Sequence, residues 1–392
     1  MRKMPIVLAM MIIATGQVGV SIYLPSLPLI SQTLEASQAD VQLLVTLFLV
    51  GFGASQLFYG PLSDAIGRRP VFILGQGIYL LGTVICLLLS HHLESLILGR
   101  LLQGLGAGSA SVLGRSVLRD SYDGAQLTRA LSYISVTASV MPILAPVIGG
   151  WLAFYLGWQS VFMFVLCYLM AIFTLGYFVL PETMSYGKSR FSLRQVVSNY
   201  RQLMTSRQVL TSASYNWVSY LASLVSLSVM PFLLQHELGL TVAEYGSVMI
   251  IPSAGLMIGS LTLNVLTRYL SSNQLLSIAI SLLMLGGVWL VLAPVSLFNL
   301  VAPFTLLAIA QGLSFPISIS LLLEPHKRQA GAVSALSGSI QMCLAGVLGG
   351  YLVESWVHSQ YAMGIFYLLC ACTMATVLSL SKANHNVQQE LA

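Results

Sequence analysis

The sequence predicts an all-α polytopic membrane protein with 12 transmembrane helices in two pseudo-symmetric bundles of six. Hydrophobic residues make up 57% of the 392-residue chain and charged residues only 7%, whereas soluble domains carry roughly 25% charged residues. A helical crossing of the bilayer needs about 20 apolar residues. The chain therefore has room for about twelve crossings joined by short loops.

The apolar runs give the helices in order. They cover residues 5–27, 39–62, 70–90, 94–118, 129–154, 158–180, 209–235, 242–266, 273–294, 298–322, 329–354 and 358–381. The first run lacks a small-residue cleavage site followed by a soluble domain. We therefore expect it to be the first transmembrane helix rather than a removed signal peptide.

The basic residues predict the orientation of these helices. Arg100 and Arg115 lie within the fourth helix, and the other fifteen of the 17 lysines and arginines fall on one side of the membrane when the N-terminus is placed in the cytoplasm. This asymmetry is the positive-inside pattern. Both termini are therefore expected in the cytoplasm, and the net charge of +5 requires no nucleic-acid partner.

A polar turn between the second and third helices carries the most specific motif. It resembles the helix 2–3 loop of the major facilitator superfamily, G-x-L-x-D-x-x-G-R-[KR], and departs from it at Ala65. The matching residues are Gly60, Leu62, Asp64, Gly67, Arg68 and Arg69. The resemblance implies a gate at the cytoplasmic face and a substrate site at mid-bilayer, between two six-helix bundles.

Two echoes along the chain support the division into halves. Residues 145–152 recur as 345–352, and Gln103-Gly104-Leu105 recurs as Gln311-Gly312-Leu313. We expect an N-terminal bundle at 1–180, a cytoplasmic linker at 181–208 and a C-terminal bundle at 209–392. The basic linker is either an amphipathic helix on anionic lipid or a solvated tether.

Arg100 is the candidate for proton coupling. An arginine near the middle of a transmembrane helix costs about 2.5–3.5 kcal/mol on insertion scales, so it should face protein or water. The run from Arg100 to Gly108 resembles the R-x-x-x-G-x-G signature of drug exporters, which links the arginine to proton transfer. The alternative is a structural arginine bound to backbone carbonyls.

The fifth helix resembles the antiporter motif of the same superfamily. Pro142, Pro146, Gly149 and Gly150 interrupt it, and Ala145 stands where the motif has glycine. Glycine permits close helix approach and proline bends the axis. A kinked packing helix is the alternative, and both interpretations can hold together.

The first helix ends in Tyr23-Leu24-Pro25-Ser26-Leu27-Pro28, which resembles the ending found in the bicyclomycin-resistance/EmrD-like subgroup. Many relatives carry an aspartate where this chain has Ser21. This chain has no aspartate or glutamate near the centre of a predicted helix, although a buried carboxylate is the simplest proton carrier. Asp40 on the outer face and Asp64 and Glu324 on the inner face are therefore the candidates for proton exchange with bulk water.

Aromatic, amide and methionine side chains suggest an adaptable apolar pocket that favours lipophilic compounds over sugars or phosphorylated metabolites. For any one of these residues, packing or lipid contact is the alternative. The candidate substrate-binding residues are Gln17, Ser21, Phe48, Phe52, Gln56, Tyr133, Met141, Tyr215, Trp217, Phe315 and Gln341.

The resemblance as a whole implies a monomeric multidrug efflux antiporter of a bacterial inner membrane, in which inward proton flow drives export of amphipathic drugs. A proton-coupled exporter of one specific metabolite would share every feature. A membrane-embedded enzyme is disfavoured because the sequence has no H-E-x-x-H, no paired intramembrane aspartates and no nucleotide-binding loop. The expected partners are lipid, protons and small amphipathic substrates, and no cofactor or metal is expected.

Overall fold

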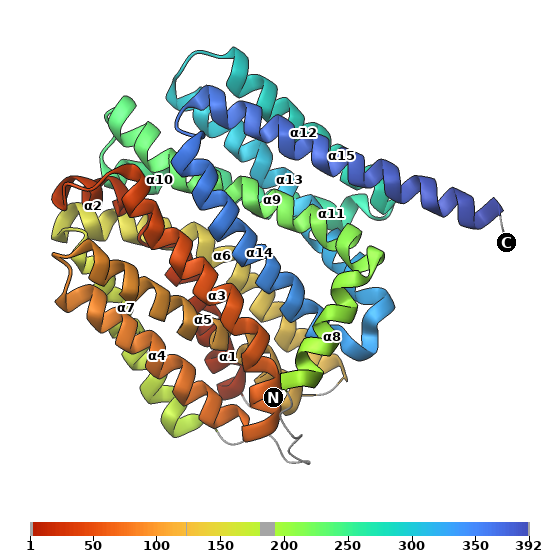
Figure 1. Ribbon diagram of the computed structural model, residues 1–392, viewed down its shortest axis with the longest axis horizontal. Helices are drawn as coiled ribbons and strands as arrows, with labels where there is room; N and C mark the ends of the chain where they lie inside the picture. Colours follow the sequence, from red (N-terminus) through yellow and green to blue (C-terminus); the bar gives the residue numbers. More distant parts are fainter. Residues whose placement is uncertain (1–2, 123, 181–192, 391–392) are drawn as a thin grey trace.

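The computed structural model describes residues 3–122, 124–180 and 193–390, and helices dominate these ranges (Figure 1). The N-terminal half contains α1 (Lys3–Ser21), the 3-10 turn η1 (Leu24–Ser26), α2 (Leu27–Thr33), α3 (Gln38–Ile66), α4 (Arg68–Leu88), α5 (Leu93–Ser121), α6 (Gly124–Leu156) and α7 (Gln159–Val179).

The C-terminal half follows a short helix, α8 (Leu193–Thr205). It contains α9 (Arg207–Phe232), the π-helical turn η2 (Leu233–Glu237), α10 (Val242–Val248), α11 (Ile250–Leu266), α12 (Ser272–Leu292), α13 (Leu297–Leu323), the 3-10 segment η3 (Glu324–Gln329), α14 (Ala330–Ser355) and α15 (Gln360–Glu390).

Eleven helical segments among the described residues are long and apolar enough to cross a membrane, and a shorter apolar stretch, Leu144–Leu156, lies within α6. With α6 as the twelfth crossing, these segments agree with the predicted 12-helix architecture. Two of the crossings consist of two helices each. The first continues from α1 through η1 into α2, and the eighth is formed by α10 and α11.

The breaks in these crossings have local causes. Pro25 and Pro28 follow the end of α1 at Ser21, where proline removes a backbone donor and resists a continuous helix. Pro252 follows the junction between α10 and α11 in the same way. The first apolar run was predicted to end near residue 27, and its helical structure in fact continues, after the break, to Thr33.

The two ends of the bundle differ in charge. We call the end that joins α3 to α4 and α11 to α12 the basic end, because Arg68, Arg69 and Arg268 lie there. We call the opposite end the acidic end. Its acidic residues, by element and sequence, are Glu35, Asp40, Glu94, Glu237, Glu244 and Glu354.

The halves meet along two helix pairs. The long helices α3 and α14 run side by side through the middle of the molecule (Figure 1), and α6 packs against α10 and the start of α11. The helix α8 lies at the basic end, next to α9 and α14. It falls inside the segment predicted as a linker, whose residues 181–192 lie outside the described residues.

Candidate functional site

Arg100 is enclosed by helices of the N-terminal half. Its side chain is only 2% exposed, about two turns into α5. The guanidinium donates hydrogen bonds to the Gly19 carbonyl at 2.9 Å, the Leu44 carbonyl at 3.2 Å and Gln103 Oε1 at 2.6 Å. One side chain thus ties α5 to α1 and α3.

Two aromatic rings complete the surroundings of Arg100. The guanidinium carbon lies 3.8 Å from the centroid of the Tyr23 ring and 4.1 Å from that of Phe48. Such contacts stabilise a desolvated cation by about 2 kcal/mol. The contacts match the structural role weighed above for this arginine, and they also place its charge next to the break in the first crossing.

That break is a meeting point of three elements. Tyr23, in the break, stacks on Arg100, and a Cβ at Gly149 of α6 would collide with the Ile22 carbonyl. Pro25, in η1, accepts a hydrogen bond at 2.8 Å from Gln235 Nε2 of the C-terminal half. The position of the break is therefore linked to both halves.

The loop motif forms an ion-pair network at the basic end. Arg68 bridges Asp64 of α3 at 2.6 Å and Asp120 of α5 at 3.0 Å, and it also donates to Ser63 Oγ. Gly67 joins α3 to α4 with a φ of 109°, a backbone conformation that residues other than glycine rarely adopt. The motif therefore fixes α3, α4 and α5 at this end.

The next motif residue, Arg69, contacts α7. It donates to the Tyr177 carbonyl at 2.9 Å and lies 5.5 Å from the Tyr177 ring centroid. Gly60 is partly buried within α3 and faces Val112 of α5, where an added Cβ would lie at 3.9 Å. All members of the predicted gating motif thus lie on or between neighbouring helices of one half.

The residues of the predicted antiporter motif lie where α6 meets α10. A Cβ at Gly150 would lie 2.6 Å from the Val242 carbonyl, and one at Gly246 would lie 2.8 Å from the Pro146 carbonyl. The two backbones can approach this closely only because both positions are glycine. Pro142 and Pro146 lie inside a helix that remains continuous from Gly124 to Leu156.

A second small-residue seam joins α3 to α14. A Cβ at Gly53 would meet Cys343 Sγ at 2.7 Å, and one at Gly346 would meet the Thr46 carbonyl at 3.0 Å. A Cβ at Gly338 would lie 2.9 Å from Gln56 Oε1. The predicted pocket residue Gln56 therefore lies at the contact between the halves.

Three predicted pocket residues, Phe48, Phe52 and Met141, belong to one apolar cluster that spans both halves. Phe52 of α3 and Met342 of α14 are buried in it, and Met141 of α6 and Tyr220 of α9 pack against it. We call these four residues the inter-half cluster. Their polarisable and aromatic side chains give the contact between the halves an adaptable apolar surface.

Polar side chains in the same region pair across helices. Asn216 donates to Gln341 Oε1 at 2.8 Å, and Trp217 donates to the Ser337 carbonyl at 3.0 Å, so both pairs join α9 to α14. Gln341, Asn216 and Trp217 were predicted near the pocket. Ser337 was not, because polar residues in apolar helices carry no signal about which helix they face.

Other predicted pocket residues have different surroundings. Phe48 is buried beneath Arg100, and Tyr215 is buried in the core of the C-terminal half. Tyr133 and Phe315 expose 38% and 36% of their surfaces. Ser21 is buried at the end of α1, and Gln17 is partly buried one turn earlier. Of these six residues, Phe48 belongs to the same apolar cluster as Phe52, and the contact of all six with substrate stays a prediction.

The acidic candidates lie at helix ends. Asp40 and Ser37 form a reciprocal capping box at the start of α3, with Asp40 accepting from the Ser37 backbone at 3.0 Å. Glu324 is exposed at the start of η3. Asp40 therefore stabilises a helix terminus, and its part in proton exchange, like that of Glu324, stays a prediction.

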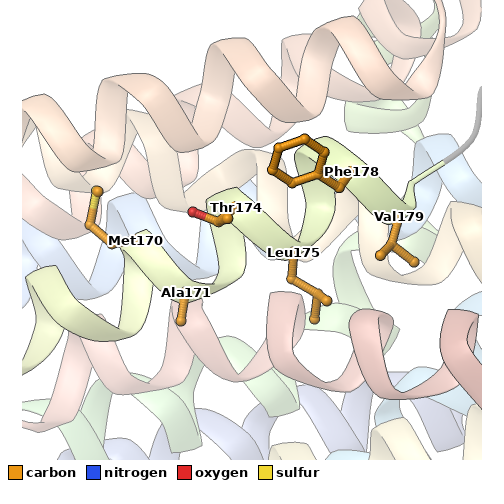
Figure 2. Close-up of a pocket in the computed structure, with 6 residues that line it drawn as sticks. All are labelled: Met170, Ala171, Thr174, Leu175, Phe178 and Val179. Carbon is orange, nitrogen blue, oxygen red and sulfur yellow. The ribbon is translucent and has the colours of Figure 1, made fainter.

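A shallow apolar groove runs along α7 (Figure 2). Met170, Ala171, Thr174, Leu175, Phe178 and Val179 line it. Phe178 is 79% exposed, as expected for a surface that faces lipid. Within the described ranges, no three His, Cys, Asp or Glu side chains are close enough together to hold a metal ion.

The fold and motifs define a polytopic membrane transporter. Residues 8–350 match the family model described as Major Facilitator Superfamily, and the chain belongs to that family. The family expected from the sequence motifs is thus confirmed, and members of this family are transporters, not enzymes.

Curated relatives extend over almost the whole chain. The chain is 30% identical over 375 residues to multidrug resistance protein MdtL of Escherichia coli O157:H7 (strain EC4115 / EHEC), with 92% of this chain and 90% of that protein covered. It is 28% identical over 372 residues to MdtL of Shigella dysenteriae serotype 1 (strain Sd197), with the same shares covered.

A solved structure has the same fold. The crystal structure of the nucleoside transporter NupG superposes with a TM-score of 0.74 at 14% identity, covering 97% of this chain and 98% of that one. At this identity the likeness concerns the fold alone.

Proposed function

We propose that this protein is a drug efflux transporter of a bacterial inner membrane, and that inward proton flow drives export of lipophilic and amphipathic compounds. The observation that carries the proposal is the inter-half cluster, in which Phe52, Met141, Tyr220 and Met342 meet from both halves. An apolar, adaptable surface suits varied lipophiles. The relatives named multidrug resistance protein support the same assignment.

The proposed orientation places the basic end and both termini in the cytoplasm. Its support is the distribution of charge, because the loops of the acidic end contain no lysine or arginine in the sequence. The chain divides into bundles at 1–180 and 209–392, with 181–208 between them as the linker. We take the transporter to act as a monomer.

In this orientation the structure corresponds to a state closed toward the outside. At the acidic end, Gln32 Nε2 lies 3.2 Å from His236 Nε2, and Gln42 donates to Ser228 Oγ at 3.3 Å, so both pairs join the halves. The close packing of Gly150 in α6 against Val242 and Gly246 in α10 closes the same end. Transport requires these contacts to open while the basic end closes.

The Asp64–Arg68–Asp120 network is the proposed gate at the basic end. It holds α3, α4 and α5 as one rigid unit that moves with its half. Asp64 is the half-exposed member of this network, and exposed ion pairs contribute only about 0.2–1 kcal/mol. That amount is enough to bias two nearly balanced conformations.

Proton coupling is proposed to act through Arg100 without Arg100 releasing a proton. Guanidinium stays charged at physiological pH, so Arg100 acts on its neighbours through its field and hydrogen bonds. The Arg100–Gln103 bond continues to Thr83 Oγ1 at 2.9 Å, which gives a polar chain inside the half. Asp40, Asp64 and Glu324 remain the proposed groups for exchange with water at the two ends.

Drug uptake by inverted membrane vesicles tests the proposed function. Vesicles that contain the protein should accumulate a lipophilic drug when the lumen is acidified, and collapse of the pH gradient should release it. Vesicles without the protein are the control. A saturable uptake of one metabolite, with no competition from unrelated lipophiles, would instead favour the specific metabolite exporter.

A further inference from the structure

The charged side chains of the membrane-spanning helices are unevenly placed. Among the described charged side chains inside these spans, Arg100 lies about two turns from the end, and every other one lies in the first or last turn. Acidic residues follow the same rule. Asp40, Asp64, Glu94, Glu237, Glu244, Glu324 and Glu354 are all within a turn of a span end.

The charge of Arg100 is solvated but not neutralised. Its hydrogen-bond acceptors are two backbone carbonyls and one amide oxygen, and its other contacts are two rings. These groups supply dipoles and quadrupoles and no negative charge. Counting only the side chains that the structure describes, the interior of the N-terminal half therefore keeps a net positive charge.

This charge lies close to the inter-half cluster. Phe48 stacks on Arg100 at 4.1 Å, and its ring meets the ring of Phe52 edge-on at 5.9 Å between centroids. A single aromatic ring thus separates the guanidinium from the cluster. Charges interact strongly across such a distance in a medium of low dielectric constant.

We propose that the substrates of this transporter are uncharged amphiphiles, and that permanent lipophilic cations are excluded. The inference rests on the proposed efflux function and names its substrate class. A cation at the cluster would be repelled by Arg100 and, among the described side chains, would meet no carboxylate to offset its desolvation. An uncharged compound of the same shape avoids both costs.

Anions are not the preferred class either. The guanidinium is 2% exposed and enclosed between Tyr23 and Phe48. An anion at the cluster therefore cannot form the direct, two-pronged hydrogen bonds by which arginine binds carboxylates or phosphates. Arg100 would attract such an anion from a distance, but it could not form the direct hydrogen bonds that would stabilise the anion's buried charge.

Ser21 is the position at which this selectivity can be reversed. It lies two residues after Gly19, which accepts from Arg100, and two before Tyr23, which stacks on Arg100. Ser21 is buried there at 4% exposure. A carboxylate at this position would lie between two residues that contact the arginine and would offset its positive field, so Ser21→Asp should admit cations.

The test compares two compounds of nearly equal shape, triphenylphosphine oxide and methyltriphenylphosphonium. Radiolabelled uptake of each is measured in inverted vesicles with an acidic lumen and with the membrane potential clamped to zero. The wild type should take up the oxide at least tenfold faster than the phosphonium. Ser21→Asp should raise phosphonium uptake at least fivefold, and the matched variant Ser21→Asn should not.

The outcomes separate this inference from the function on which it rests. Equal uptake of both compounds by the wild type would overturn the charge selectivity and leave the efflux function in place. Uptake of neither compound would overturn the efflux function and the inference with it. If Ser21→Asp does not fold, quenching of tryptophan fluorescence in purified wild-type protein still decides, because the oxide should bind at least tenfold more tightly than the phosphonium.

Discussion

The guanidinium carbon of Arg100 lies 3.8 Å from the ring centroid of Tyr23, and this contact links the fourth crossing to the break in the first. Gly149 of α6 packs against the same break at the Ile22 carbonyl, and Gln235 of the other half donates a hydrogen bond to the Pro25 carbonyl just after it. A change at Arg100 is therefore transmitted to a segment that both halves touch. Arg100 is a packing residue, and we propose that it is also the fixed charge of the transport region.

Replacing Arg100 separates these two properties. Arg100→Ala leaves three acceptors without a donor and removes the cation from two rings, so it should destabilise the protein by about 2–4 kcal/mol. Arg100→Lys keeps the charge but loses the planar stacking, and we expect it to retain a fraction of the transport. Thermal unfolding in detergent and vesicle uptake measure both effects. Drug accumulation by Arg100→Ala with a normal response to pH would leave Arg100 a structural residue only.

Removing the charge of Asp64 should weaken the gate without unfolding the protein. Asp64 is half exposed, and Arg68 keeps its bond to Asp120 in the Asp64→Asn variant. We expect transport to fall about two- to fivefold, in line with the loss of an exposed ion pair, while expression stays unchanged. Uptake rates normalised to protein level measure this effect. A normal rate would remove Asp64 from the gating mechanism.

The seam between α3 and α14 should tolerate no side chain at Gly346. A Cβ there would meet the Thr46 carbonyl at 3.0 Å and Leu49 Cβ at 3.1 Å. Gly346→Leu should therefore cost about 1–3 kcal/mol of stability and lower transport. Gly77→Leu on α4 is the matched control, because an added Cβ at Gly77 meets nothing within 4 Å. Equal melting temperatures for the two variants would show that the seam is not tightly packed in the membrane.

The orientation predicts which residues are accessible from outside. Gln208 at the start of α9 and Glu237 at the end of η2 are both exposed, and they lie at opposite ends of the bundle. In a cysteine-free background, Glu237→Cys should react with an impermeant maleimide in intact cells. Gln208→Cys should react only after the membrane is opened. The reverse pattern would invert the topology and move Asp64 to the outer face.

The sequence was sufficient for the helices and for the family, because both depend on local information. Runs of apolar residues give the crossings regardless of their partners, and Gly67 with Arg68 forms a turn whose requirements lie within a few residues. The prolines at 25 and 28 were visible as well. The sequence did not show that the crossing breaks at Ser21 and resumes in α2, since proline marks a disturbance without giving its geometry.

The partners of individual side chains could not be predicted in this way. Phe48 was expected in the pocket because it shares a helix face with Phe52, and the sequence did not show that its ring also lies against the Arg100 guanidinium. Tyr215 was expected there as one of a cluster of polar and aromatic residues in its helix, and the sequence did not show that it is buried in the core of its own half. These outcomes depend on how helices rotate and pack, which a single apolar sequence does not specify.

A reversible crosslink at the acidic end tests the central claim, that this end must open for transport. Gln32 and His236 belong to different halves and lie 3.2 Å apart through their Nε2 atoms. The five native cysteines are replaced, Gln32→Cys and His236→Cys are introduced, and a short bis-methanethiosulfonate links them in vesicles. We predict that the link stops drug uptake and that reduction with dithiothreitol restores it, while each single-cysteine variant is unaffected. Full uptake by the linked protein would contradict the account.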